Sequence, residues 1–195
     1  NMKTFISVFI VLMSFLNCKA QYNYNDFTSL VNNVNDLYLQ FSFDAGDNVN
    51  DMTGKLFLNK SSYRLELANF IIFNNGSDYV NFNKDTNEAT LFNASDDELN
   101  VASIFNLCSN GKPIPLTEDD SIASFEINAP VDLSFSKVIV YIDKQTNFID
   151  NLIVFVADNQ YEIKISDYNV NQNISADVFN FDQNRYPDVT LIDMR

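Results

Sequence analysis

The chain of 195 residues contains no histidine, no tryptophan and only two cysteines. Without histidine, a Ser-His-Asp triad, a Cys-His pair and the usual histidine-containing zinc sites are excluded. One cysteine, Cys18, lies in an apolar N-terminal segment, so the rest of the chain has Cys108 alone and no internal disulfide. We interpret Cys108 as a small buried apolar side chain. No pair of carboxylates is singled out either, so we expect no enzymatic activity, no cofactor and no metal site.

Glycine, proline and positive charge are also scarce. With 4 Gly, 4 Pro and 46% hydrophobic residues, the chain is not a low-complexity or disordered sequence and is long enough for one domain with a sizeable core. Its 12 basic against 26 acidic residues give a net charge of −14. Such a chain repels nucleic acid and anionic membrane surfaces, so we expect no nucleic-acid binding and partners with basic patches.

Residues 1–20 have the pattern of a secretory signal peptide. Lys3 precedes an apolar run over residues 5–16, and Cys18 and Ala20 place small residues at positions −3 and −1 of a cut before Gln21. The run is too short to span a bilayer comfortably. We therefore expect a leader over 1–20 and one domain over 21–195. Lipidation of Cys18 is the alternative, although Leu16 and Asn17 suit that processing poorly.

Two segments have helical periodicity. Over 23–36, apolar residues at Phe27, Leu30, Val31 and Val34 form one face. Over 96–108, a capping box Ser-x-x-Glu at 95–98 precedes an apolar stripe, and Gly111 follows the end.

Most of the remaining chain alternates apolar and polar residues with the period of β-strands. We expect strands near 37–43, 55–59, 63–67, 70–73, 79–83, 89–92, 122–127, 135–142, 148–157 and 161–166. The segment 109–121 is interpreted as a proline-containing loop, and 176–181 as a last excursion before the tail. About 9–11 strands with two helices indicate an α+β fold, in which a single curved antiparallel sheet has helices over its open side.

The order of these motifs resembles the LolA family of lipoprotein carriers, in its Bacteroidetes-type form. Four stretches of the sequence carry the resemblance: Gly54–Leu58 with Tyr63–Leu67, Ile71–Gly76 with Tyr79–Phe82, Phe135–Asn147, and Phe179–Asp182 with Tyr186–Arg195. The last of these resembles the family ending "F-F-D…YPgVevIDlR".

The resemblance implies a half-open β-barrel with a helical lid, whose cavity holds the acyl chains of lipoproteins. It also implies a periplasmic monomer that shuttles lipoproteins from the inner to the outer membrane. An inner-membrane lipoprotein-releasing ABC transporter loads such a carrier, and in some bacteria an outer-membrane receptor unloads it. No cofactor is involved. A carrier of this kind must offer a dry apolar surface that its own lid covers when empty.

The lipid-binding residues follow from the inward faces of the strands and the stripe of the 96–108 helix. The expected cavity residues are Leu39, Phe41, Leu56, Leu58, Tyr63, Leu65, Leu67, Val138, Val140, Leu152, Val154 and Ile163, with lid contacts from Val101, Ile104 and Phe105. The family often latches its lid with an Arg-Pro pair. Here Asn59-Lys60-Ser61 stands instead, so Lys60 or Arg64 is the candidate latch.

Two other functions stay open from the sequence. A related module that binds another hydrophobic ligand or acts as a sensor has the same fold requirements, since a fold does not fix a ligand. A membrane-anchored receptor follows if Cys18 is lipidated.

Overall fold

The computed structural model describes residues 21–44, 52–96 and 101–195 of the chain. The expected signal peptide, Cys18 and the acidic part of the capping box lie outside these residues. Within them, no helix has the length and apolar character needed to cross a membrane. The elements are α2 (Tyr24–Asn32), β1 (Leu37–Asp44), β2 (Met52–Asn59), β3 (Ser62–Glu66), β4 (Phe70–Asn74), β5 (Asp78–Asn83), β6 (Glu88–Asn93), η1 (Ala94–Asp96), α3 (Val101–Asn110), β7 (Ile114–Glu118), β8 (Ile122–Asn128), β9 (Lys137–Asp143), β10 (Phe148–Val156), β11 (Asn159–Val170), η2 (Ala176–Phe179), η3 (Gln183–Arg185) and β12 (Thr190–Asp193).

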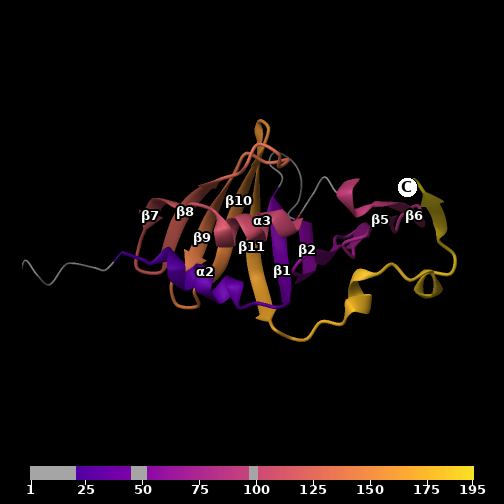
Figure 1. Ribbon diagram of the computed structural model, residues 1–195, viewed down its shortest axis with the longest axis horizontal. Coiled ribbons are helices and arrows are strands. Elements are labelled where there is room, and N and C mark those ends of the chain that lie inside the picture. The colour runs from indigo at the N-terminus through magenta and orange to yellow at the C-terminus, as the bar shows by residue number, and fades with distance from the viewer. Residues whose placement is uncertain (1–20, 45–51, 97–100) are drawn as a thin grey trace, which may run out of the picture.

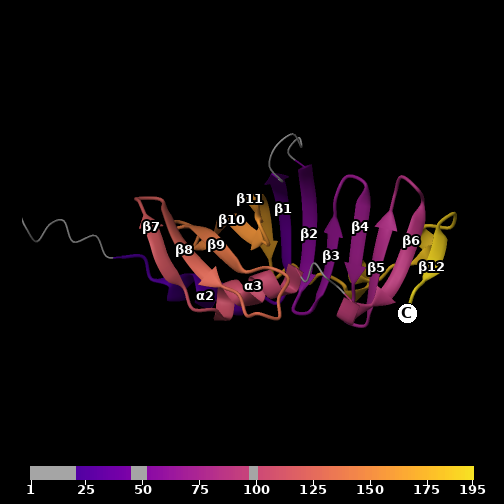
Figure 2. The same cartoon turned by 90° about the horizontal axis from the view of Figure 1, so that it is seen from above.

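All the strands in the described residues belong to one sheet. Its 12 strands run in the order β12-β6-β5-β4-β3-β2-β1-β11-β10-β9-β8-β7, so the sheet begins and ends on different strands and is not closed. Neighbours are antiparallel except β12, which pairs parallel to β6. Figures 1 and 2 show the sheet curving around α2 and α3. This is the expected α+β fold, an open barrel with helices over one face.

Both ends of the sheet correct the sequence prediction. The loop expected over 109–121 contains β7, and the expected tail contains β12, so the sheet has 12 strands instead of 9–11 and is not wholly antiparallel. Both strands are exposed along their whole length. Since neither strand has one buried face, its sequence lacks the alternation of apolar and polar residues by which a strand is predicted. Pro115 also lies in β7, as edge strands permit. The excursion at 176–181 is the 3₁₀ helix η2.

Both helices are shorter or shifted relative to the prediction. The segment expected to be helical over 23–36 ends at Asn32, where the N–H groups of Asn33 and Val34 donate to the carbonyls of Leu30 and Val31. The second helix is described over Val101–Asn110, so it ends two residues beyond the expected 108, and Ala94–Asp96 form the 3₁₀ helix η1.

One face of the sheet carries the two helices, and we call it the helix face. Phe27 of α2 and Cys108 of α3 are fully buried against strand residues such as Leu39, Tyr63 and Val140. These residues form the larger of two apolar clusters in the described chain, and the cluster includes residues from β1 to β4 and β8 to β10. Burial of this surface is the main stabilising contribution to the fold.

Over β3 to β6 the opposite face is covered by residues 171–189, which we call the C-terminal arm, and we call this side of the whole sheet the arm face. Its Val189 is buried with Phe73, Val80 and Phe82, which alternate with the residues of the helix face. Figure 2 shows the arm on the far side of β4 to β6 from α3. The apolar side of the sheet therefore changes at β4, where residues of both faces are buried.

A buried carboxylate holds the first residues of the arm in place. Asp36 is 6% exposed, and its oxygens accept hydrogen bonds from the backbone N–H groups of Gln172 (2.7 Å) and Ile174 (3.3 Å). The N–H of Asn171 donates to the carbonyl of Asp36 at 2.9 Å. The segment between α2 and β1 is thus joined to the point where the chain leaves β11.

Candidate functional site

The candidate site is the helix face together with its cover, α3. Eight of the residues expected to line a cavity are buried there, at 8% exposure or less. They are Leu39, Leu56, Leu58, Tyr63, Val138, Val140, Leu152 and Val154. The structure therefore brings these residues from five strands into one continuous apolar surface, and the helices fill the space above it.

Six further expected residues pack on the margin of this surface. Phe41, Leu65 and Ile163 of the sheet and Val101, Ile104 and Phe105 of α3 are partly buried against the same cluster. Leu67 also is partly buried, but it lines a pocket beside the cluster.

Sequence reasoning missed several members of the surface. Phe125, Ile127, Ile142 and Phe148 are buried in the same cluster, as is Leu107 of α3. The sequence predicts a strand over 122–127 but does not show which of its residues point inward. In the structure Ala123, Ser124 and Phe125 are all buried, so the strand has no simple alternation of buried and exposed residues.

The lid helix is held by apolar contacts. No residue of α3, whose sequence is VASIFNLCSN, has a charged acidic or basic side chain, so none can form an ion pair. Leu107 and Cys108 are its buried residues, and α3 contacts α2, β3 and β9. At its end, a Cβ on Gly111 would lie 2.4 Å from Ile127 Cγ2, so only glycine permits this close approach of the helix to β8.

One hydrogen bond joins the two helices. The hydroxyl of Tyr24 on α2 donates to the carbonyl oxygen of Cys108 at 2.5 Å. The Tyr24 ring packs edge-on to Phe125, with 4.7 Å between ring centroids, and tilted against Phe27 at 5.3 Å. Tyr24 thus links α2, α3 and β8.

The ionisable groups of this layer are held neutral. Burial raises the pKa of the Cys108 thiol to about 12. The pKa of Tyr24 is also raised, mainly because its hydroxyl is buried and to a smaller extent because Cys108 is close. A neutral, fully buried thiol is a poor nucleophile. Among the described residues, no cluster of three or more His, Cys, Asp or Glu side chains has the geometry to hold a metal ion.

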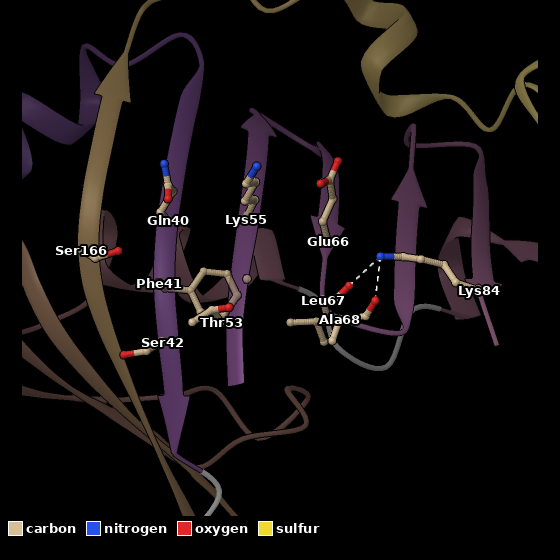
Figure 3. A pocket seen from close by; sticks show the side chains of 11 residues that line it. Gln40, Phe41, Ser42, Thr53, Lys55, Glu66, Leu67, Ala68, Lys84 and Ser166 are labelled. Atoms are coloured by element: carbon tan, nitrogen blue, oxygen red, sulfur yellow. Dashed lines mark hydrogen bonds between the residues drawn. The ribbon is translucent and has the colours of Figure 1, made fainter. Parts of the chain in front are cut away.

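An open pocket of about 460 Å³ lies beside the apolar surface, across β11, β1, β2 and β3 (Figure 3). Two expected cavity residues, Phe41 and Leu67, line it with Gly54, Lys55 and Lys84. The Lys84 ammonium donates to the carbonyls of Leu67 (2.9 Å) and Ala68 (2.8 Å). The pocket gives the apolar surface an accessible margin with cationic groups nearby.

Glycine is required in the floor of this pocket. A Cβ on Gly54 would lie 2.5 Å from Phe41 Cζ and 2.9 Å from Leu67 Cδ2. The Phe41 ring therefore lies directly across Gly54, its partner in the β1–β2 register.

The two candidate latch residues differ in position. Arg64 follows buried Tyr63, so its side chain is on the arm face, where it bonds Glu66 at 2.6 Å and lies 5.1 Å from the Phe73 ring centroid. Lys60 is exposed, with φ 47, at the turn between β2 and β3. The position of Arg64 corrects the expectation that it reaches the lid, because strand alternation directs it to the other face.

Comparison with known proteins gives similarities of structure only. No family model matches the chain, and no curated protein matches it by sequence. Among solved structures, a DUF1329 family protein from Desulfovibrio piger is 10% identical with a TM-score of 0.47, over 80% of this chain and 95% of that one.

Two further solved structures are similar to a comparable degree. A putative outer membrane lipoprotein-sorting protein domain from Vibrio parahaemolyticus is 8% identical with a TM-score of 0.46, over 84% of this chain and 96% of that one. A LolA superfamily protein from Nitrosomonas europaea is 9% identical with a TM-score of 0.45, over 83% of this chain and 99% of that one. The chain's structural neighbours thus include LolA-superfamily proteins, and the function proposed below rests on the chain's own residues.

Proposed function

We propose that this chain is a periplasmic carrier that binds the acyl chains of lipoproteins on its helix face and shuttles them from the inner to the outer membrane. The observation that supports this most is the pairing of a wide apolar surface with a cover that has no charged side chain. Such a cover can be exchanged for another apolar group without breaking an ion pair. The role is also the one that the sequence resemblance to LolA carriers implies.

The energies of the exchange are of similar size. An acyl chain that buries about ten methylenes gains about 8 kcal/mol, at about 0.8 kcal/mol for each. Six apolar residues of α3 contact the surface, two of them buried and four partly buried. At about 1.5 to 3 kcal/mol for each buried side chain and about half of that for each partly buried one, they stabilise the closed lid by about 6 to 12 kcal/mol. Because these two free energies are nearly equal, the acyl chain can both bind to the surface and leave it.

Charge and accessibility indicate how cargo reaches the surface. The net charge of −14 disfavours adsorption to anionic lipid, so transfer requires protein partners with basic surfaces. In this proposal the partners are an inner-membrane lipoprotein-releasing ABC transporter and, where the organism has one, an outer-membrane receptor. The pocket at Phe41 and Leu67 offers the first accessible apolar contact for an acyl chain.

The test is capture of lipid in the cell. The full chain is expressed in a bacterial periplasm, purified without detergent and analysed by mass spectrometry for bound acylated peptides, alongside Leu65→Glu and a control, Leu116→Glu. Leu65 packs on the apolar surface, whereas Leu116 is 47% exposed on the edge strand β7. We expect acylated lipoprotein to be bound to the wild type and to Leu116→Glu. We expect none on Leu65→Glu.

Other outcomes point elsewhere. A lipid-free wild type that also fails to solubilise added lipoprotein would refute the carrier role and favour a sensor or another binding module. A mature N-terminus with a diacylglyceryl group on Cys18 would refute shuttling and favour an anchored receptor.

A further inference from the structure

The helix face changes its chemistry at β5. Its middle row follows the strand register from Leu39 through Leu56, Leu65 and Ile72, all apolar, on β1 to β4. The next positions in that row are Asn81 on β5 and Thr90 on β6. With strands about 4.8 Å apart, the row from β1 to β5 spans about 19 Å. That is of the order of the length of an extended long acyl chain.

Asn81 holds an unsatisfied acceptor at this boundary. Its amide oxygen Oδ1 is buried and has no hydrogen-bond partner among the described residues. Its register partner on β4 is Ile72, which is 5% exposed and offers no side-chain donor. An unpaired buried acceptor costs about 1 to 3 kcal/mol, and native proteins keep few of them.

The surroundings of Asn81 define what kind of donor fits. Across the strands, Asn81 lies between Ile72 and Thr90. Along its own strand, Asn83 and its exposed partner Glu88 continue the polar character. One row along, the rings of Tyr79 and Phe92 lie 5.9 Å apart on the same face. A group that binds here must therefore carry an N–H or O–H where its hydrocarbon part ends.

We propose that Asn81 is a specificity-determining residue that accepts a hydrogen bond from an amide N–H at the junction between an acyl chain and a peptide. This inference rests on the proposed function and deepens it by naming the residue that recognises the amide next to the acyl chains. A phosphatidylcholine has the same hydrocarbon chains but no N–H or O–H donor. Asn81 therefore distinguishes an acylated peptide from a lipid that lacks such a donor.

The experiment compares three probes that differ in the donor. They are a cysteinyl peptide with a dipalmitoylglyceryl thioether and an N-palmitoyl amide, the same peptide with its first amide nitrogens methylated, and dipalmitoyl phosphatidylcholine. Dissociation constants are measured by calorimetry for the wild type, for Asn81→Leu and for a control, Asn169→Leu. Asn169 is an exposed residue of β11 whose register partner is Tyr38, on the face away from the helices.

The expected result is selective. Wild type and Asn169→Leu bind the N–H peptide about fivefold to tenfold more tightly than the methylated peptide, which is the contribution of one hydrogen bond in a partly dry site. Asn81→Leu loses that difference and binds the other two probes as the wild type does. Its thermal stability is unchanged or higher, because an unpaired polar atom has been removed from the folded protein.

Three results would overturn the inference. They are an equal loss of affinity for all probes in Asn81→Leu, no loss of affinity for any probe, and a lower melting temperature of this variant. Each would show that Asn81 does not select ligands by their hydrogen-bond donor. In each case the binding of the wild type still supports the carrier. If the wild type binds none of the probes, the proposed function fails, and this inference fails with it.

Discussion

Replacing Ile104 of the lid helix with alanine should make ligand binding tighter. Ile104 is partly buried against the apolar surface that α3 covers. If a ligand reaches that surface only after α3 moves away, the measured dissociation constant is the intrinsic one divided by the fraction of open molecules. Any change that weakens the docking of α3 without touching the surface then lowers the measured constant.

The size of the effect follows from the buried area. Complete burial of an isoleucine side chain contributes about 1.5 to 3 kcal/mol, so a partly buried one contributes about half of that. Ile104→Ala therefore weakens lid docking by about 1.4 kcal/mol, which is a tenfold increase in the open population. Alanine is a strong helix former, so α3 itself keeps its conformation.

The assay is anisotropy of a labelled lipopeptide against protein concentration, with Ile139→Ala as the control. Ile139 lies between buried Val138 and Val140 of β9 and is partly exposed on the arm face. We expect about a tenfold lower dissociation constant for Ile104→Ala and no change for Ile139→Ala. An unchanged or weaker affinity in Ile104→Ala would show that α3 is part of the binding surface and does not act as its lid.

Two further predictions concern the same layer. Alkaline pH should release the helices: burial raises the pKa of Tyr24 above its usual value of 10.0 and that of Cys108 from 9.0 to about 12. The neutral forms are therefore favoured in the folded state, and their contribution is complete below about pH 9 and is lost as pH rises toward 12. Circular dichroism should show this loss, and Tyr24→Phe, which cannot ionise, should flatten it while costing about 1 kcal/mol at pH 7 through its lost hydrogen bond. Gly54→Ala should destabilise the chain by about 1 to 3 kcal/mol in urea, because its Cβ displaces the Phe41 ring. The double variant Phe41→Leu/Gly54→Ala should recover part of that loss, and strict additivity would contradict the crowding argument.

The central strands could be predicted because their faces differ. On β9, Val138, Val140 and Ile142 are fully buried and alternate with more exposed residues, which is the period-two pattern that the sequence shows. Such a strand also identifies its inward residues. For that reason most expected cavity residues lie in one apolar cluster.

The two edges and the reversal of faces could not be predicted from local patterns. On β4, Ile71, Ile72 and Phe73 are all buried, because the helix cluster takes one side and the C-terminal arm takes the other. A run of apolar residues marks such a strand but does not say which elements cover each side. The direction of Arg64 depends on that choice, and its expected place beside the lid was therefore wrong.

The covers of the two faces differ in how they are held, and this difference indicates which of them moves. The C-terminal arm is joined to the rest of the chain by directional bonds. Asp36 accepts two backbone N–H groups, Asn75 donates to Asn180 at 2.8 Å, and Asn87 donates to the carbonyl of Asp188 at 2.7 Å. A lipid cannot replace these bonds, and displacing the arm would leave the buried carboxylate of Asp36 without its two N–H donors.

The lid helix has the opposite character. Its contacts with the sheet come from apolar side chains, and hydrophobic contact is non-directional. A hydrocarbon chain restores the same contacts to the sheet that α3 gives up, whereas the one hydrogen bond from Tyr24 costs about 1 kcal/mol. In the proposed carrier the arm is therefore the cover that stays in place and α3 is the cover that hydrocarbon replaces, which is the division of roles that reversible binding requires.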